Sequence, residues 1–284
     1  MTDIPTPQTV AEALAWASDR IDSESARLDA VLLLGRVMGQ SRTWLYTWPD
    51  AALSETQQAA FQTLVERRAV GEPVAYLLGE REFWSLPLSV NASTLIPRPD
   101  TECLVETILV LALPEQARVL DLGTGTGAIA LALAFERPEW QVWGVDRSPE
   151  AVALAKANSV KLALEHVHFA ESDWFSALEP QHFHMIVANP PYIDAQDPHL
   201  EQGDVRFEPR SALVAGDAGL ADLRDIVHAA PDWLMPGGWI VLEHGWQQAE
   251  AVQALLEARG FRRVASQRDY GGNLRLTLAQ WESP

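Results

Sequence analysis

The sequence predicts an α/β protein in which helices cover both faces of a mainly parallel sheet, preceded by a smaller helical region. Two observations lead to this fold class. Beyond Pro99, short apolar runs typical of strands alternate with helical patterns, and this alternation is characteristic of parallel sheets. Before residue 75, apolar residues recur only at the three-to-four spacing of helices. A chain of 284 residues is long enough for two domains.

We predict that residues 1–75 form a helical bundle that carries no chemistry of its own. Helical spacing recurs in three stretches, residues 11–21, 28–35 and 61–65. Ser54 is followed three positions later by Gln57, and this pair has the pattern of a capping box. The pattern predicts that a helix begins directly after Ser54.

Residues 76–98 are predicted to form a linker built on a β-hairpin. The stretch from Phe83 to Val90 alternates in the manner of a strand. Pro87 lies within it and confines such a strand to an edge position, because proline has no backbone N–H to donate. Residues Asn91 to Thr94 have turn-forming side chains, so we place the hairpin turn there.

Residues 99–284 are predicted to form the α/β domain. The strand-like runs are Arg118–Leu122, Gln141–Val145, Val167–Ala170, Met185–Ala188 and Trp239–Leu242. The helical patterns that separate most of them are Ala128–Phe135, Pro149–Leu162, Leu220–Leu234 and Gln247–Ala258. Ser148 and Pro149 together form a strong helix-start signal, with a capping hydroxyl before a proline at the first helical position.

Composition narrows the possible partners and the compartment. The chain has 21 basic and 39 acidic residues, for a net charge of −18, which argues against gripping duplex DNA through its phosphates. No apolar run approaches the roughly 20 residues that a membrane span needs, and no secretory signal is visible, so we expect a cytoplasmic protein. The single cysteine, Cys103, cannot form an intrachain disulfide or a cysteine-based zinc site.

A glycine-rich loop follows the first predicted strand and opens a helix. Its sequence is Asp121-Leu122-Gly123-Thr124-Gly125-Thr126-Gly127. In parallel sheets, ligands bind at the carboxyl ends of strands, and glycines there allow the backbone to approach a ligand directly. The spacing Gly-x-Gly-x-Gly differs from the Gly-x-Gly-x-x-Gly of dinucleotide-binding proteins. Gly123, Thr124, Gly125, Thr126 and Gly127 are therefore cofactor-binding candidates, with a simple tight turn as the alternative interpretation.

Acidic and aromatic residues after the next two strands extend this site. Asp146 ends the second strand, 23 positions beyond Gly123, where an acidic side chain accepts hydrogen bonds from ribose hydroxyls. The alternative role for Asp146 is to support the helix cap at Ser148. Asp173 and Trp174 follow the third strand and suit an adenine, which needs a polar partner and a flat apolar face. Trp174 could also be plain core, but together these residues predict an adenosine-containing cofactor.

The fourth strand ends in Asn189-Pro190-Pro191-Tyr192, and this motif predicts the reaction. Combined with the cofactor site, it resembles the class I S-adenosylmethionine-dependent methyltransferases that modify planar nitrogens. The Asn189 side-chain oxygen and the Pro190 carbonyl can each accept one N–H of an amide and orient its nitrogen toward the methyl donor. Adjacent prolines fix the backbone, and Tyr192 offers a face for the planar group. A rigid exit turn is the alternative interpretation of the prolines.

The segment Leu95-Ile96-Pro97-Arg98-Pro99-Asp100-Thr101-Glu102 narrows the family. It resembles the bacterial release factor glutamine methyltransferases, also called HemK or PrmC, and the resemblance extends to Leu242–Gly245 and Asp269–Gly272. It implies a Rossmann-like methyltransferase domain with a mainly parallel seven-stranded sheet, an N-terminal bundle that binds the release factor and a β-hairpin linker. It also implies S-adenosylmethionine as cofactor, S-adenosylhomocysteine as product and no metal.

The same resemblance implies the substrate and the site residues. The substrate is the glutamine of the GGQ loop in peptide chain release factors one and two, methylated at N5. Asn189, Pro190, Pro191 and Tyr192 bind this glutamine, and Asn189, Pro190 and Tyr192 are the catalytic residues, Asn189 also lying against the cofactor. No membrane and no direct nucleic-acid partner are expected.

Three other functions remain open at this point. A nucleic-acid adenine-N6 methyltransferase uses the same Asn-Pro-Pro-Tyr chemistry, although we find no target-recognition region. A dinucleotide-dependent oxidoreductase is disfavoured by the glycine spacing. A binding module without catalytic activity is disfavoured by the presence of both Asn189 and the glycine loop.

Several polar residues are left without a firm role. The acidic loop that holds Asp194, Asp197, His199 and Glu201 lacks a standard metal-ligand spacing, so a solvated loop is the favoured interpretation. Arg98 either orders the cofactor or substrate loop or pairs with Asp100. Glu243 and His244 follow a strand and receive no assignment.

Overall fold

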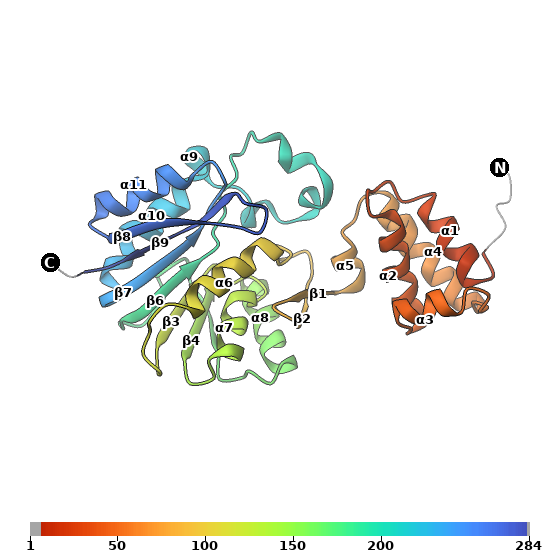
Figure 1. The fold of residues 1–284 in the computed structure, drawn as a ribbon, viewed down its shortest axis with the longest axis horizontal. Helices are drawn as coiled ribbons and strands as arrows, with labels where there is room; N and C mark the ends of the chain where they lie inside the picture. Colours follow the sequence, from red (N-terminus) through yellow and green to blue (C-terminus); the bar gives the residue numbers. More distant parts are fainter. Residues whose placement is uncertain (1–6, 283–284) are drawn as a thin grey trace. The chain divides into compact units, whose positions relative to one another are not determined.

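The computed structural model describes residues 7–282, which form two compact units (Figure 1). The first unit ends at Glu80 and also includes the distant segment Glu201–Phe207. The second unit runs from Arg81 to Leu200 and continues from Glu208. The first unit is therefore built from two stretches of sequence that lie more than 100 positions apart.

The first unit is helical. Its helices are α1 (Val10–Ser18), α2 (Ala26–Met38), α3 (Arg42–Thr47), α4 (Glu55–Ala69) and α5 (Val74–Leu78). The predicted capping box at the start of α4 is confirmed, since Ser54 Oγ accepts the Gln57 N–H at 3.3 Å and Gln57 Oε1 accepts the Ser54 N–H at 2.9 Å. The helices pack around fully buried apolar side chains, among them Val31, Leu34, Phe61 and Val65.

Arg68 joins the two stretches of the first unit. Its Nε lies 2.8 Å from Asp29 Oδ2, and its Nη1 lies 3.2 Å from Asp204 Oδ1. Asp29 is only 4% exposed, and a buried carboxylate requires such a charged partner. Asp204 belongs to the distant segment Glu201–Phe207, so one guanidinium connects the bundle to it.

A two-stranded hairpin, β1 (Glu80–Phe83) and β2 (Leu86–Ser89), follows; all of it except Glu80 belongs to the second unit. Its turn lies at Trp84 and Ser85, which both have positive φ, 54° and 60°. The prediction of a turn at Asn91–Thr94 was therefore wrong. Neither a tryptophan nor a serine signals a left-handed turn in sequence, because that conformation usually selects glycine, asparagine or aspartate.

The hairpin packs into the core of the second unit. Phe83 and Leu88 are buried in the same apolar cluster as the helices of one sheet face. The buried Asn158 of a neighbouring helix binds both backbone groups of Ser89, accepting its N–H at 2.7 Å and donating to its carbonyl at 3.0 Å. The same Asn158 amide donates to the carbonyl of Thr126 at 2.9 Å. One side chain thus fixes the hairpin against the glycine-rich loop.

The main sheet has seven strands in the order β5-β4-β3-β6-β7-β9-β8. Its strands are β3 (Arg118–Leu122), β4 (Gln141–Asp146), β5 (His168–Glu171), β6 (Phe183–Ala188), β7 (Leu234–Glu243), β8 (Arg262–Arg268) and β9 (Leu274–Gln280). The first five are parallel and agree with the predicted strands, whereas β9 pairs antiparallel with both β7 and β8. This confirms the predicted mainly parallel, Rossmann-like architecture.

Helices cover both faces of this sheet (Figure 1). Apolar side chains from α6 (Glu102–Leu109), α7 (Ala128–Glu136) and α8 (Pro149–Lys161) pack on one face. Those from α10 (Ala221–Ala229) and α11 (Ala249–Arg259) pack on the other. Residues alternate between the faces, as β-strands require: Val119 faces the first core and Leu120 faces the second. The predicted cap of α8 is confirmed by the Ala151 N–H, which donates to Ser148 Oγ at 3.2 Å.

The remaining elements are short. They are the 3₁₀ turns Pro99–Thr101, Pro198–Glu201, Gly203–Phe207, Arg210–Ala212 and Ala230–Asp232, and α9 (Gly216–Gly219). Within α9, Asp217 and Ala218 have left-handed backbone angles, so this element is a tight turn rather than a regular helix. Among the described residues, every helix is too short or too polar to cross a bilayer.

Candidate active site

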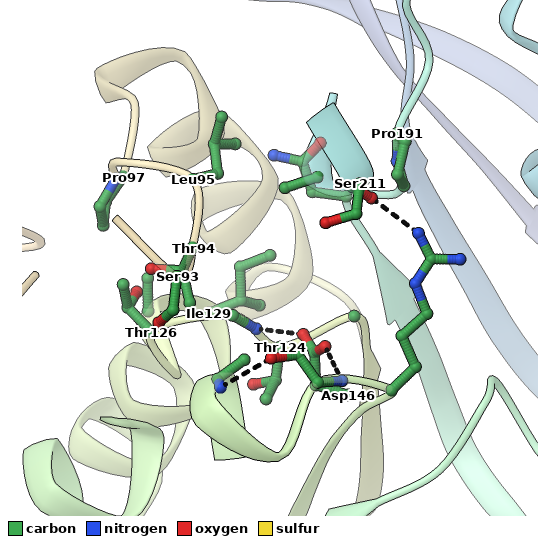
Figure 2. Close-up of a pocket in the computed structure, with 18 of the residues that line it drawn as sticks. Ser93, Thr94, Leu95, Pro97, Thr124, Thr126, Ile129, Asp146, Pro191 and Ser211 are labelled. Atoms are coloured by element: carbon green, nitrogen blue, oxygen red, sulfur yellow. Dashed lines mark hydrogen bonds between the residues drawn. The ribbon is translucent and has the colours of Figure 1, made fainter. Parts of the chain in front are cut away.

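The second unit contains a pocket at the carboxyl ends of β3, β4, β5 and β6 (Figure 2). Ser93, Thr94, Leu95 and Pro97 lie along one side of it, while Thr124 and Asp146 lie on another. Strands β4 and β5 lie on one side of β3, whereas β6, the next strand in the sequence, lies on its other side. Ligands bind at such switch points in open α/β sheets.

The glycine-rich loop forms the floor of this pocket. Gly123, Gly125 and Gly127 all have positive φ, at 71°, 55° and 82°, a conformation that costs glycine little. Gly123 and Gly125 line the pocket. Gly127 does not: a Cβ there would lie 3.0 Å from Leu131 and 3.1 Å from Phe169. Gly127 thus lets α7 begin close to the sheet, and it does not line the pocket as the other four cofactor candidates of the loop do.

Asp146 joins the loop to the next helix. Its Oδ2 accepts the Gly125 N–H and its Oδ1 accepts the Ser148 N–H, each at 2.9 Å. A carboxylate has about four lone-pair positions, so each oxygen can accept a further hydrogen bond. Asp146 lines the pocket and is half-buried. It therefore supports the helix start, as one of the two roles considered from the sequence requires, and its remaining acceptor positions are compatible with the other.

Asp121, in strand β3, forms a hydrogen bond with the glycine-rich loop. The Thr124 hydroxyl donates to Asp121 Oδ2 at 2.6 Å. Asp121 is fully buried, and this desolvation raises its pKa to about 7 although the bond from Thr124 opposes the shift. The proton of the Thr124 hydroxyl is therefore committed to Asp121 and not to a ligand.

Trp174 forms another wall of the pocket, together with Asp173. Trp174 has a φ of 47°, an uncommon conformation for a bulky residue that concentrates at functional sites. Its turn is held by Ser172, whose Oγ donates to the Trp174 carbonyl at 2.9 Å and accepts the Ala177 N–H at 3.0 Å. The indole lies over the loop, 3.4 Å from where a Cβ on Gly123 would stand. Asp173 is exposed beside it.

The Asn-Pro-Pro-Tyr motif follows β6 and reaches the same pocket. Asn189 and Pro191 line it, whereas Pro190 is buried and Tyr192 points toward the sheet. The Tyr192 hydroxyl donates to Glu243 Oε1 at 3.3 Å. Burial raises the pKa of Tyr192 above its usual value, and the neighbouring Glu243 charge adds to the shift. The structure thus brings Asn189 beside the glycine loop and anchors Tyr192 through its hydroxyl.

The segment before α6 supplies a wall that sequence reasoning did not assign. Arg98 forms an ion pair with Glu208, which corrects the alternative of pairing with Asp100. The other oxygen of Glu208 accepts the Ile96 N–H at 3.0 Å, and the Glu208 side chain is fully buried. The partners are 110 positions apart, so no local pattern indicates the pair. The segment Leu95–Glu102 pointed to this wall of the pocket only through its resemblance to a known family.

The remaining polar candidates, in the acidic loop and at His244, make hydrogen bonds within the protein. Asp194 Oδ1 accepts the Gln196 N–H and Asp197 Oδ1 accepts the His199 N–H, each at 2.8 Å, so these carboxylates stabilise turns. Within residues 7–282, no cluster of three or more His, Cys, Asp or Glu is arranged to hold a metal ion. His244 is buried, with Nε2 2.8 Å from Thr277 Oγ1, and burial lowers its pKa.

Comparison with known proteins identifies both parts of the chain. Residues 12–79 match the PrmC N-terminal domain, and residues 99–204 match the methyltransferase small domain. The release factor glutamine methyltransferase of Shewanella oneidensis is 57% identical over 96% of both chains. The protein of the same name from Pseudomonas aeruginosa is 58% identical over 92% of this chain and 94% of its own.

Solved structures support the fold. A methyltransferase from Pyrococcus furiosus is 17% identical and superposes with a TM-score of 0.53, covering 70% of this chain and 90% of its own. The hMettl16 catalytic domain is also 17% identical, with a TM-score of 0.57 over 77% of this chain and 81% of its own. At this identity the likeness concerns the fold alone. The close relatives settle the family: the chain belongs to the release factor glutamine methyltransferases.

Proposed function

We propose that this protein transfers a methyl group from S-adenosylmethionine to the N5 side-chain nitrogen of the GGQ glutamine in peptide chain release factors one and two. Its place of action would be the cytoplasm. Membership of the release factor glutamine methyltransferase family supports this activity. The observation that carries it here is that Asn189 and Pro191 line the same pocket as the glycine loop and Asp146.

The pocket residues fit the proposed cofactor. Asp146 has free lone-pair positions for ribose hydroxyls, Trp174 offers an aromatic face for an adenine, and Gly123 and Gly125 leave the loop backbone open. Near Gly125, the closest atom to a built Cβ is the Thr94 Cβ at 3.8 Å. S-adenosylmethionine would supply an electrophilic methyl group on a positively charged sulfur.

The chain's own residues would orient the glutamine amide. Amide nitrogens are poor nucleophiles because the lone pair is delocalised into the carbonyl. We assign the two N–H groups of the substrate to the Asn189 side-chain oxygen and the Pro190 carbonyl, which fixes the nitrogen in a reactive orientation. The two prolines restrict the backbone, so this carbonyl is preorganised. The methylated nitrogen then releases its extra proton to solvent.

The helical unit is proposed to bind the release factor. Tyr46 and Trp48, at the end of α3, are 49% and 58% exposed, and exposed aromatic residues are frequent anchors at protein interfaces. The Y46A/W48A variant should raise the KM for intact release factor roughly tenfold, the effect of losing a moderate anchor. Turnover of a short GGQ peptide should be unchanged. An unchanged KM for the intact protein would refute this binding role.

A labelling experiment tests the proposed function directly. Labelled S-adenosylmethionine is offered with three acceptors: a release factor, the same factor with its GGQ glutamine changed to alanine, and duplex DNA. The proposal expects label on the first acceptor alone. Label on DNA would instead identify an adenine methyltransferase, and equal label on both release factors would show that another residue is modified.

A further inference from the structure

Asn189 has a side-chain partner outside the Asn-Pro-Pro-Tyr motif. Its Nδ2 donates to Thr101 Oγ1 at 3.3 Å. Thr101 ends the short turn Pro99–Thr101, 88 positions earlier in the chain, and lines the same pocket although only 4% of its surface is exposed. One N–H of the Asn189 amide is therefore hydrogen-bonded to a buried hydroxyl.

Beyond Thr101 lies a buried carboxylate, that of Glu243 at the end of β7. Glu243 is 2% exposed, and its Oε1 accepts the Tyr192 hydroxyl at 3.3 Å. Its Oε2 has no partner at hydrogen-bonding distance among residues 7–282. The Thr101 side chain also interacts with this carboxylate and favours its ionised form. Glu243 therefore binds Tyr192 at one end of the motif, and it lies near Thr101, the partner of Asn189 at the other end.

The hydrogen-bonding capacities of these groups limit how they can be oriented toward one another. An ionised carboxylate only accepts, and a threonine hydroxyl has one proton to donate. If Thr101 donates that proton to Glu243, its oxygen can only accept from Asn189. The Asn189 group that faces Thr101 must then be the NH₂ end of the amide, and the acceptor oxygen Oδ1 must point the other way. A reversed amide would present donors to a substrate that itself needs acceptors.

We propose that Thr101 and Glu243 are positioning residues that hold the Asn189 amide with its oxygen toward the substrate nitrogen. This inference rests on the proposed function, because it assigns Oδ1 to a substrate N–H. It adds two residues from outside the motif, and neither needs to touch the substrate. Glu243 also holds the Tyr192 hydroxyl, so one carboxylate orients the first and last residues of the motif.

The surroundings of Glu243 define the conditions of a test. Besides Tyr192 and Thr101, the charged groups that act on it are Arg275, which favours its ionised form, and Asp100, which opposes it. Arg275 is itself held by Asp269, with Nε 3.0 Å from Oδ2. Burial raises the pKa of Glu243 to about 7. Methylation of a release factor should therefore be assayed at about pH 8.5, where the carboxylate is ionised.

Two substitutions at Thr101 separate the hydroxyl from the shape of the side chain. Thr101→Val keeps the volume and removes the hydroxyl, and Thr101→Ser keeps the hydroxyl. We expect T101V to lower kcat by about 10- to 100-fold, the usual cost of misorienting a reacting group, with KM for the release factor within about threefold of wild type. T101S should recover kcat to within about threefold of wild type. Calorimetric titration with S-adenosylhomocysteine counts the folded sites in each variant.

Thr107→Val is the matched control. Thr107 is 5% exposed, and its hydroxyl lies 2.8 Å from the Cys103 carbonyl and 2.7 Å from Gln267 Oε1, away from the pocket. The control loses a buried hydroxyl of the same kind, so it should keep wild-type kcat per folded site. If T107V loses as much kcat as T101V, the effect of T101V is a general packing defect and the positioning role is wrong.

Glu243→Gln tests the direction of the chain. A glutamine can donate to Thr101 and reverse the bond to Asn189, so E243Q should lower kcat by about tenfold at unchanged KM. The double variant T101V/E243Q should be no worse than T101V, since both changes break one chain. Fully multiplicative losses, or wild-type kcat in both single variants, would overturn the inference while wild-type methylation upholds the proposed function. Absence of methylation by the wild type would overturn both.

Discussion

The two sides of the pocket are built by different means. On the proposed cofactor side, backbone N–H groups of the glycine loop and of Ser148 converge on the half-exposed Asp146. On the proposed substrate side, side chains from three separate elements lie close together, namely the half-buried Asn189 and the buried Thr101 and Glu243. The comparison teaches that one side depends mainly on chain geometry and the other on individual side-chain atoms. Substitutions on the two sides should therefore change different constants.

The largest expected effect is that of Asn189→Ala, which removes the proposed acceptor of the substrate N–H. Turnover should fall by roughly 100- to 1,000-fold, as for the loss of one preorganised polar group. Affinity for S-adenosylhomocysteine, measured by calorimetry, should stay within about threefold, because a preorganised backbone loop forms most of the other side. A collapse of cofactor affinity with turnover preserved in the bound complex would reverse the assignment of the two sides.

Asp146→Ala should have a smaller effect and act on the opposite constant. Affinity for S-adenosylhomocysteine should weaken by about 1.5–3 kcal/mol, the usual contribution of hydrogen bonds to a charged acceptor. The kcat at saturating cofactor should change much less. Asp225→Ala is a suitable control, since Asp225 is an exposed carboxylate that does not line the pocket. Unchanged affinity in D146A would remove Asp146 from the cofactor site.

The pH dependence of stability should distinguish the buried carboxylate from its neighbours. Because the folded-state pKa of Glu243 is raised to about 7, the folded protein keeps a proton that the unfolded chain releases near pH 4.5. Stability should therefore fall as pH rises from about 4.5 to 7. In E243Q this contribution is absent, so the unfolding free energy of E243Q relative to wild type should rise across that window by about 2 kcal/mol.

Denaturant unfolding at pH 5 and pH 8 measures this difference. Asp121 has a similarly raised pKa but titrates in both proteins, so its contribution cancels in the comparison. A constant difference between E243Q and wild type at the two pH values would show that Glu243 titrates normally.

Local patterns in the sequence were sufficient for the central sheet and for two helix starts. Parallel strands such as β6 are buried on both faces, so they appear as continuous apolar runs, and Ser54 and Ser148 cap their helices with their own side chains. Strands β8 and β9 were both missed. Strand β9 pairs antiparallel with both neighbours and follows β8 with no helix between them, so it lies outside the alternation of strands and helices. Strand β8 lies at the sheet edge, and most of its residues are exposed. Its charged residues therefore carry no apolar pattern.

Long-range pairs in the site could not be predicted for a different reason. Sequence proximity made Asp100 the natural partner of Arg98, whereas the fold supplies Glu208 instead. Likewise, nothing local connects Thr101 with Asn189. The motifs located the candidate residues, and only the topology of the sheet decides which of them meet.

The discontinuous first unit has a consequence for how this protein can be divided. The chain leaves the second unit at Leu200, passes through Glu201–Phe207 and returns at Glu208, whose carboxylate holds Arg98 at the pocket wall. A gene fragment cut after Glu80 would therefore leave Asp204 behind, separated from its partner Arg68. Chimeras that exchange the first unit between relatives should therefore transfer both stretches together, because no single cut in the gene separates the two units.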